Sequence, residues 1–292
     1  MAAVLVAGGM LATTVAVGAG TASAASSPLP SAIKSAGVVN IGTDANWPVC
    51  EYYPKGSGTI SGYEVDLWNA ATKLLGVKAK ATSIQFTSLI PAVQSGRFDA
   101  AAACFADTAT RQKNLIFVDF SLAGTRVYTT AANPGHVTGS PLSLCGLTTA
   151  TQSGTATVQW VTTTANPYCA KHGKAAITNL QFPSINSALL ALYDGKADFF
   201  LDTIAAGAYL QKHAPKKIIS FKAPLFSTVY DGMIFAKSDM PLAKAFLSAY
   251  KTMAGNGTTA KIFKKWGLTS LYLKNPGINL TTTRPLPSST AS

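Results

Sequence analysis

The chain has 292 residues, with 24 Lys and Arg against 12 Asp and Glu, which gives a formal net charge of +12. That length suits about two domains. With 48% hydrophobic and 12% charged residues, the composition supplies packed cores and excludes an intrinsically disordered chain. Beyond the N-terminus no apolar run reaches the length of a membrane span, which excludes a polytopic membrane protein.

The N-terminal segment has the pattern of a secretory signal. Residues 1–33 carry no charged side chain, residues 4–17 are apolar or small, and small residues at 21–25 offer cleavage sites. We therefore expect residues 1–25 to be a signal peptide, and the mature protein to be secreted or held at the outer face of the cell envelope. No cysteine lies near the cleavage site, so we expect no lipid attachment there.

Export changes the meaning of the four cysteines, because an even count outside the cytoplasm indicates disulfides. Four cysteines allow three pairings. Cys145 and Cys169 flank one local unit, and Cys50 and Cys104 each follow a predicted strand, so we favour these two pairs. Cys169 and His172 form a fragment with only two metal ligands, too few for a zinc site, so no metal is expected.

The predicted elements alternate between strand and helix, which is typical of an α/β domain. The apolar spacing first predicts a strand at 38–42, a helix at 63–74 that ends before Gly76, a strand at 77–82 and a helix at 89–94. A loop rich in turn-forming residues separates the first two. Further along, the pattern predicts a strand at 232–236 and helices at 242–253 and 256–266.

One pattern occurs twice: a helix, then Gly, a base, any residue and Asp, then a strand. The copies are residues 96–99 and residues 195–198. Repeated use of glycine as a helix stop would also produce it, but we favour two similar lobes. The expected organisation is lobe 1 at 33–125 plus 229–272 and lobe 2 at 126–228, with the first crossing over 125–134. Residues 273–292, rich in Pro, Ser and Thr, are expected to be a disordered tail.

Several kinds of active site are absent from the sequence. There is no nucleophile elbow, zinc-protease helix, phosphate loop or dinucleotide fingerprint, so no cofactor is expected. The only glutamates are Glu51 and Glu64, which excludes a paired-glutamate hydrolase. The basic residues are dispersed, whereas a nucleic-acid groove needs a cluster. The net charge instead indicates a solvated surface suited to an anionic cell envelope.

Polar groups at the expected carboxyl ends of strands predict a ligand cleft, because open α/β sheets bind ligands there. Arg111 lies in a short helix that Asp107 or Thr108 can cap. Residues 152–156 follow a strand and open a helix, whose free N–H groups attract anions. Asp202 follows another strand. Facing each other, these groups suit a small zwitterion, with Arg111 on the carboxylate and Asp202 on the ammonium.

Taken in order, these motifs resemble the extracellular solute-binding proteins of family 3, the amino-acid receptors of ABC importers. The resemblance covers about residues 38–271. It rests on segments 42–48, 62–67, 94–99, 105–111, 118–120, 145–146, 152–155 and 198–202. The Cys145 start and its partner Cys169 resemble versions from actinobacteria.

The resemblance implies a two-lobed, type II periplasmic-binding-protein-like fold, with two parallel-rich sheets joined by two hinge strands that close on the ligand. It also implies a monomer that serves an ABC permease. Ala106 replaces the usual Ser or Thr, and Cys104 replaces a small residue. The ligand-binding residues that it implies are Asp44, Trp47, Cys104, Phe105, Ala106, Arg111, Gln152, Thr155, Ala156 and Asp202.

Two other functions are compatible with the same scaffold. One is a cyclohexadienyl-dehydratase-like enzyme, which needs a general acid or base in the cleft; the candidates are Asp44, Glu51 and Asp107. The other is a sensor or adhesin that keeps the fold without transport. The sequence does not determine the side chain of the ligand, because an apolar, amide or cationic group would suit Trp47, Phe105 and Trp160. Asp44 and Glu51 favour a polar or basic side chain.

Overall fold

The structure is a computed structural model that describes residue 1, residues 29–223 and residues 225–286. The predicted signal peptide therefore lies outside the described residues, apart from Met1. Among the helices of the described chain, none has both the length and the apolar character that a membrane span requires.

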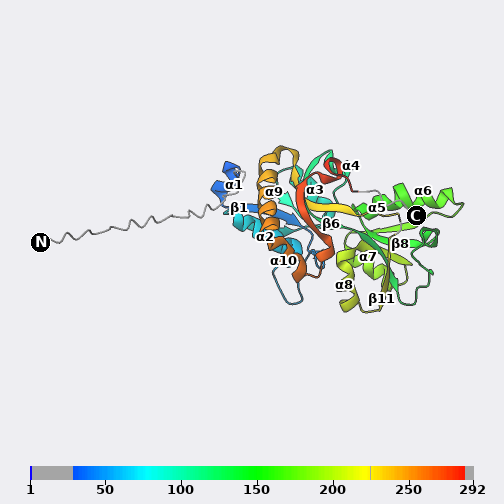
Figure 1. The fold of residues 1–292 in the computed structure, drawn as a ribbon. Helices are drawn as coiled ribbons and strands as arrows, with labels where there is room; N and C mark the ends of the chain where they lie inside the picture. Colours follow the sequence, from blue (N-terminus) through cyan, green and yellow to red (C-terminus); the bar gives the residue numbers. More distant parts are fainter. Residues whose placement is uncertain (2–28, 224, 287–292) are drawn as a thin grey trace.

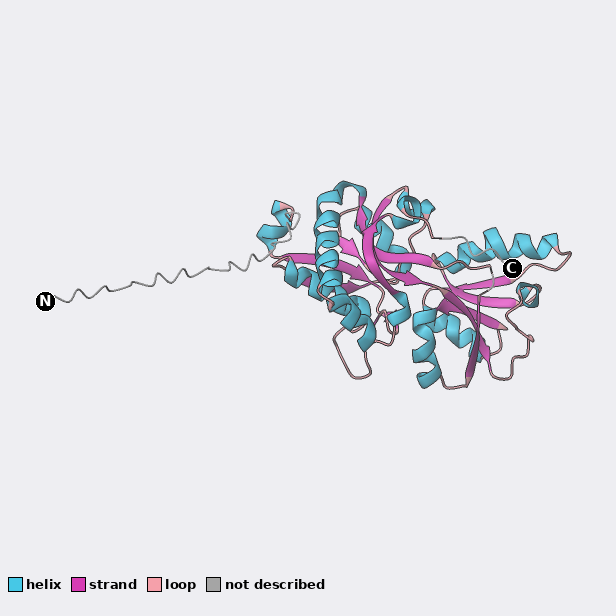
Figure 2. Ribbon diagram, viewed as in Figure 1, coloured by secondary structure: helices cyan, strands magenta, loops and turns pink. Residues whose placement is uncertain are grey.

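The described chain forms two lobes, each built on one sheet (Figure 1). In lobe 1 the strand order is β13 (Tyr272–Ile278), β6 (Leu115–Ala123), β12 (Val229–Ala236), β5 (Ala100–Ala101), β1 (Val38–Thr43) and β4 (Lys78–Ser83). In lobe 2 it is β11 (Ile218–Lys222), β7 (Thr125–Thr130), β10 (Phe199–Thr203), β8 (Thr148–Gln152) and β9 (Thr178–Phe182). The strands of the two sheets approach each other in the middle of the molecule (Figure 2). This agrees with the two-lobed α/β expectation.

Both sheets are mixed: one part of each has the expected parallel pairing, and the other part is antiparallel. β1 pairs in parallel with β4 and β5, and β8 with β9 and β10. By contrast, β12 runs antiparallel to β5 and β6, and β7 runs antiparallel to β10 and β11. The path of the chain is the reason: β6 leaves lobe 1 and β12 returns to it, so these neighbours run in opposite directions.

The two crossings between the lobes lie side by side. β6 ends at Ala123 and β7 begins at Thr125, so the first crossing is Gly124 and not residues 125–134 as expected. The return runs from β11 to β12, whose Val229 pairs with Ala123. A Cβ at Gly124 would lie 2.6 Å from Cδ1 of Ile204, so a larger residue there would require the exposed Ile204 side chain of lobe 2 to move.

Helices cover the sheets close to where the sequence predicts them. In lobe 1 they are α1 (Ser31–Ala36), α2 (Tyr63–Leu74), α3 (Phe86–Gln94), α4 (Ala109–Gln112), α9 (Met240–Gly255), α10 (Thr258–Lys265) and α11 (Leu280–Thr283). In lobe 2 they are α5 (Ala156–Trp160), α6 (Asn166–Lys171), α7 (Ile185–Tyr193) and α8 (Ile204–His213), with a π-helical segment, Val161–Ala165, between α5 and α6. The predicted loop after β1 contains a small hairpin of β2 (Asn46–Trp47) and β3 (Glu51–Tyr52).

The prediction of a disordered tail is wrong for residues 273–286. β13 pairs with β6, and α11 follows it. The amide of Leu280 donates to Oδ2 of Asp119 over 2.8 Å, and the amide of Phe117 donates to Oδ1 of Asn279 over 2.8 Å. Leu280 is buried, and its packing outweighs the turn-forming composition on which the expectation rested. Residues 287–292 lie outside the described residues.

Both predicted disulfides are present, one in each lobe. Cys145–Cys169 ties the segment just before β8 to α6, within lobe 2. Cys50–Cys104 ties the loop after β1 to the segment after β5. The second bond therefore fastens two segments that lead toward the meeting place of the lobes.

Candidate ligand-binding cleft

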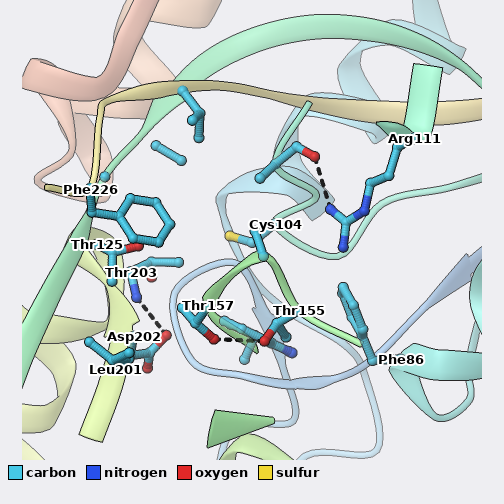
Figure 3. Close-up of a pocket in the computed structure, with 16 residues that line it drawn as sticks. Phe86, Cys104, Arg111, Thr125, Thr155, Thr157, Leu201, Asp202, Thr203 and Phe226 are labelled. Carbon is cyan, nitrogen blue, oxygen red and sulfur yellow. Dashed lines mark hydrogen bonds between the residues drawn. The ribbon is translucent and has the colours of Figure 1, made fainter. Parts of the chain in front are cut away.

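A cavity lies between the lobes and is lined by both of them (Figure 3). Lobe 1 contributes Trp47, Phe86, Cys104, Ala106 and Arg111, and lobe 2 contributes Thr155, Ala156, Thr157, Leu201, Asp202, Thr203 and Phe226. The crossings add Ala123, Gly124, Thr125 and Val229. The predicted guanidinium and the predicted carboxylate thus line one cavity from opposite lobes.

Arg111 is positioned by its own lobe and reaches the other. Thr108 caps α4, and its Oγ1 accepts a hydrogen bond from the Arg111 amide over 3.2 Å. Nη1 of Arg111 donates to the carbonyl of Ala106 over 2.9 Å, and Nη2 donates to the carbonyl of Gly154 in lobe 2 over 3.0 Å. A guanidinium carries five N–H groups, so these two bonds leave donors for an anionic ligand.

The charge of Arg111 persists at neutral pH. Burial lowers the pKa of its guanidinium to about 10, against the opposing effect of the nearby Asp231 and Asp107 carboxyls. The guanidinium carbon also lies 5.5 Å from the ring centre of Phe105, a distance at which a cation and a ring attract each other. Arg111 therefore presents a fixed positive charge to the cavity.

Asp202 is the acidic counterpart at the end of β10. It is 4% exposed, and its Oδ1 accepts a hydrogen bond from the amide of Thr203 over 2.6 Å. Burial raises the pKa of the Asp202 carboxyl to about 7, although the bonds with Thr203 oppose the shift. Within the described chain no lysine or arginine forms an ion pair with it. A cationic group in the cavity would supply the missing partner and favour the ionised form.

The turn before α5 brings hydroxyl groups to the same cavity. Oγ1 of Thr155 donates to the carbonyl of Gln152 over 2.7 Å, and the hydroxyls of Thr155 and Thr157 lie 2.7 Å apart. Thr157 was missed by the sequence analysis, although it is only two residues from a predicted ligand residue. Together with the first amides of the helix, these groups form a polar corner.

Three predicted site residues lie beside the cavity and do not line it. Nε2 of Gln152 donates to Oδ2 of Asp44 over 2.8 Å, which joins lobe 2 to lobe 1. Asp44 also accepts from Nδ2 of Asn46 over 2.6 Å. Phe105 is fully buried beneath Phe86, with ring centres 4.8 Å apart. Asp44 and Gln152 therefore bridge the lobes, and Phe105 supports the wall.

Two aromatic side chains of the cavity were not predicted. Phe86 opens α3 just after β4, at the strand edge where ligands were expected, so its position in the sequence could have revealed it. Phe226 lies on the lobe 2 side of the segment between β11 and β12, which has no periodic pattern. Trp160 packs behind Phe226, with ring centres 5.8 Å apart, and its Nε1 donates to the carbonyl of Leu225.

The candidate general acids and bases do not reach the cavity lining. Glu51 is fully buried in lobe 1, where burial and the Glu64 carboxyl raise its pKa well above the ordinary value. Both oxygens of Asp107 accept hydrogen bonds from Nε2 of Gln112, and one also accepts from the amide of Thr281. Asp44 is engaged with Gln152 as described above. Among the described residues, Asp202 is the acid that lines the cavity.

Comparison with known proteins identifies relatives over nearly the whole described fold. The family model for bacterial extracellular solute-binding proteins, family 3, matches residues 39–269. The arginine-binding protein ArgT of Corynebacterium glutamicum is 27% identical over 252 residues, which covers 86% of this chain and 81% of that protein. The L-cystine-binding protein TcyA of Bacillus subtilis is 25% identical over 236 residues, 80% of this chain and 82% of that protein.

Solved structures agree with this assignment. An ancestral arginine-binding protein bound to glutamine aligns with a TM-score of 0.70 and 25% identity, over 80% of this chain and 98% of that one. An ancestral amino acid-binding protein, AncCDT-1, described as a precursor of cyclohexadienyl dehydratase, aligns with a TM-score of 0.68 and 25% identity, over 81% and 98%. The type II two-lobed fold is thereby confirmed. Because the family model extends over both lobes, the chain belongs to the bacterial extracellular solute-binding proteins of family 3.

Proposed function

We propose that the protein is the substrate-binding component of an ABC importer and that it holds an amino acid between its lobes. The observation that carries the proposal is the placement of Arg111 and Asp202 in one cavity, on opposite lobes. The names of the relatives, which bind arginine, L-cystine or histidine, support an amino acid as the ligand class.

The charges of the cavity match those of an α-amino acid. Arg111 receives the α-carboxylate through its remaining N–H groups, in a fork geometry that suits two oxygens. The hydroxyls and amides near Thr155 contact the same carboxylate. Asp202 receives the α-ammonium, and each charge of the ligand then faces one opposite charge of the protein.

The aromatic residues of the cavity contact the rest of the ligand. Trp47 and Phe86 stand on the lobe 1 wall, with ring centres 6.1 Å apart, and Phe226 stands on the lobe 2 wall. Flat apolar faces of this kind accept aliphatic, aromatic and cationic groups alike. The identity of the ligand side chain is therefore a matter for the binding screen below.

The protein acts by binding and not by catalysis in this proposal. Glu51 is buried in lobe 1, and Asp44 and Asp107 are engaged in internal hydrogen bonds, so none of the three candidate acids and bases lines the cavity. One copy of the chain contains both walls of the cavity, which supports a monomer. The family is extracellular by description. After binding, the protein therefore delivers the ligand to a permease at the outer face of the cell membrane.

A thermal-shift screen of the amino acids tests the proposal. A ligand that binds only the native state stabilises it by about 2.7 kcal/mol at a hundred times its Kd, so a true ligand raises Tm clearly. Arg111→Ala should abolish the rise, whereas Lys113→Ala, an exposed charge at the end of the same helix, should leave it intact. If no amino acid raises Tm or gives heat in calorimetry, the proposal fails. Consumption of a prephenate-like acid would instead show an enzyme.

A further inference from the structure

The acidic and basic residues are distributed very differently between interior and surface. Seven of the 12 acidic residues are buried: Asp44, Glu51, Glu64, Asp107, Asp119, Asp202 and Asp231. No described lysine or arginine is buried, and all but Arg111 and Arg126 are exposed. The net charge of +12 therefore understates how positive the solvent-facing surface is.

Three of the exposed cations line a groove on lobe 1, which we call the α9–β13 groove. Its volume is about 440 Å³, and its lining is Lys251, Ala254, Gly255, Lys274, Asn275, Pro276 and Arg284. Three of these residues are cations and none is an acid. One wall is the last turn of α9, and the other is β13 with the segment after α11. The second wall belongs to the region for which the sequence predicted disorder.

Arg284 is held in position at this groove. Its Nη2 donates to the carbonyl of Asn275, and its guanidinium carbon lies 5.9 Å from the ring centre of Tyr230. The hydroxyl of Tyr230 donates in turn to the carbonyl of Arg284 over 2.8 Å. A cation fixed in this way loses little conformational freedom when it meets an anion.

Neighbouring negative groups are too weak to cancel the three cations. Asp119 interacts electrostatically with Arg284, but burial raises the pKa of its carboxyl to about 8. This carboxyl is therefore largely neutral at pH 7. The end of α9 contributes roughly half a negative charge. In the described chain the ion pairs are Lys196 with Asp194 and Lys265 with Asp66, and neither involves a groove residue.

Further cations extend the positive surface beyond the groove. Lys244 precedes Lys251 by two turns of α9 and so lies on the same side of the helix. Lys261 and Lys264 are exposed on α10, which packs beside α9. Spaced cations along an open groove suit a linear polymer with repeated charges better than one small anion.

We propose that the α9–β13 groove binds a linear, phosphate-bearing polymer of the cell surface that carries no nucleobases. A phosphate on every unit of the polymer supplies an anion for each of the Lys and Arg side chains, and no aromatic ring lines the groove to stack a base. α9 lies on the side of lobe 1 that faces away from lobe 2 (Figure 1), so the polymer leaves the ligand cleft free. Such binding holds the protein at a surface that carries these phosphates.

The test uses inorganic polyphosphate as the probe and follows its binding by fluorescence anisotropy over a range of salt concentrations. The groove variant is Lys251→Gln with Lys274→Gln and Arg284→Gln. The matched control is Lys171→Gln with Lys174→Gln and Lys222→Gln, three exposed cations of lobe 2 that lower the net charge by the same amount. We expect the groove variant to lose about tenfold or more in affinity and the slope of log affinity against log salt to fall by about 2, with little change in the control.

Three results would overturn the proposal. Equal losses in the two triple variants would mean that net charge alone binds the polymer. Tighter binding of single-stranded DNA than of polyphosphate at equal phosphate count would indicate a nucleic-acid surface. Binding to vesicles of anionic lipid without binding to polyphosphate would indicate a membrane surface. Tm and amino-acid affinity of each variant report on folding and on the proposed function separately, and Arg284→Lys should retain most of the polymer affinity.

Discussion

The two walls of the cleft differ in whether their charge is present before the ligand binds. The lobe 1 wall presents Arg111, which keeps its charge at neutral pH and is fixed by the Thr108 cap and the Ala106 carbonyl. The lobe 2 wall presents Asp202, which accepts a hydrogen bond from the amide of its chain neighbour Thr203 and whose pKa of about 7 leaves it partly protonated. The carboxylate subsite is therefore ready before the ligand arrives, whereas the ammonium subsite becomes fully charged only when a cation enters it.

The largest expected loss of affinity comes from changing Arg111 on the lobe 1 wall. Arg111→Ala leaves the ligand carboxylate in the cleft without its main partner, and an unpaired buried charge costs about 3–5 kcal/mol. We expect a loss of about 10²- to 10³-fold in affinity, measured by calorimetry with the ligand found in the screen. Arg111→Lys keeps the charge and loses the fork geometry, so its affinity should lie between that of the unchanged protein and that of Arg111→Ala. Unchanged affinity of Arg111→Ala would show that lobe 1 does not hold the carboxylate.

Asp202→Asn tests the lobe 2 wall. It should reduce affinity by about 10²-fold, because the amide carries no charge to pair with the ammonium. The same change should raise the Tm of the ligand-free protein at pH 8, since the buried charge is removed. This combination of weaker binding and higher stability separates a binding role from simple misfolding. If affinity is unchanged, the ligand has no ammonium at this position.

The pH dependence of binding sharpens the comparison further. Below pH 7 Asp202 is mostly protonated, so ligand affinity should rise about tenfold per pH unit toward pH 7 and then level off. Without ligand, the raised pKa contributes stability below the unfolded-state value near pH 4, and this contribution is lost as the pH rises through 7. The ligand should therefore raise Tm more at pH 8 than at pH 6. Calorimetry from pH 5.5 to 8 checks this, and Asp202→Asn should give a flat profile.

The sequence predicted the charged pair because one rule, that ligands bind at the carboxyl ends of strands, needs only local patterns. Arg111 and Asp202 both satisfy it. Asp44 and Gln152 lie at the expected edge, but beside the cavity, where they hydrogen-bond to each other; such a bond across two lobes leaves no local signal. Phe226 lies in a crossing segment without periodicity. The ordered residues 273–286 depend on pairing with β6, more than 150 positions earlier in the chain, which composition does not reveal.

The smallest expected effect on affinity comes from removing the disulfides, one of which joins two segments of the lobe 1 wall. Chain entropy predicts that removing Cys50–Cys104, whose partners are separated by 54 positions, costs about 4 kcal/mol of unfolding free energy, and removing Cys145–Cys169, with a separation of 24, costs about 3 kcal/mol. Urea unfolding of the two double Cys→Ser variants measures these losses. Only the first bond reaches the cavity, through Cys104, so only its removal should weaken ligand binding, by a few-fold. Should the remote pair change affinity equally, the difference between the walls would lie in their charges alone and owe nothing to the covalent tie.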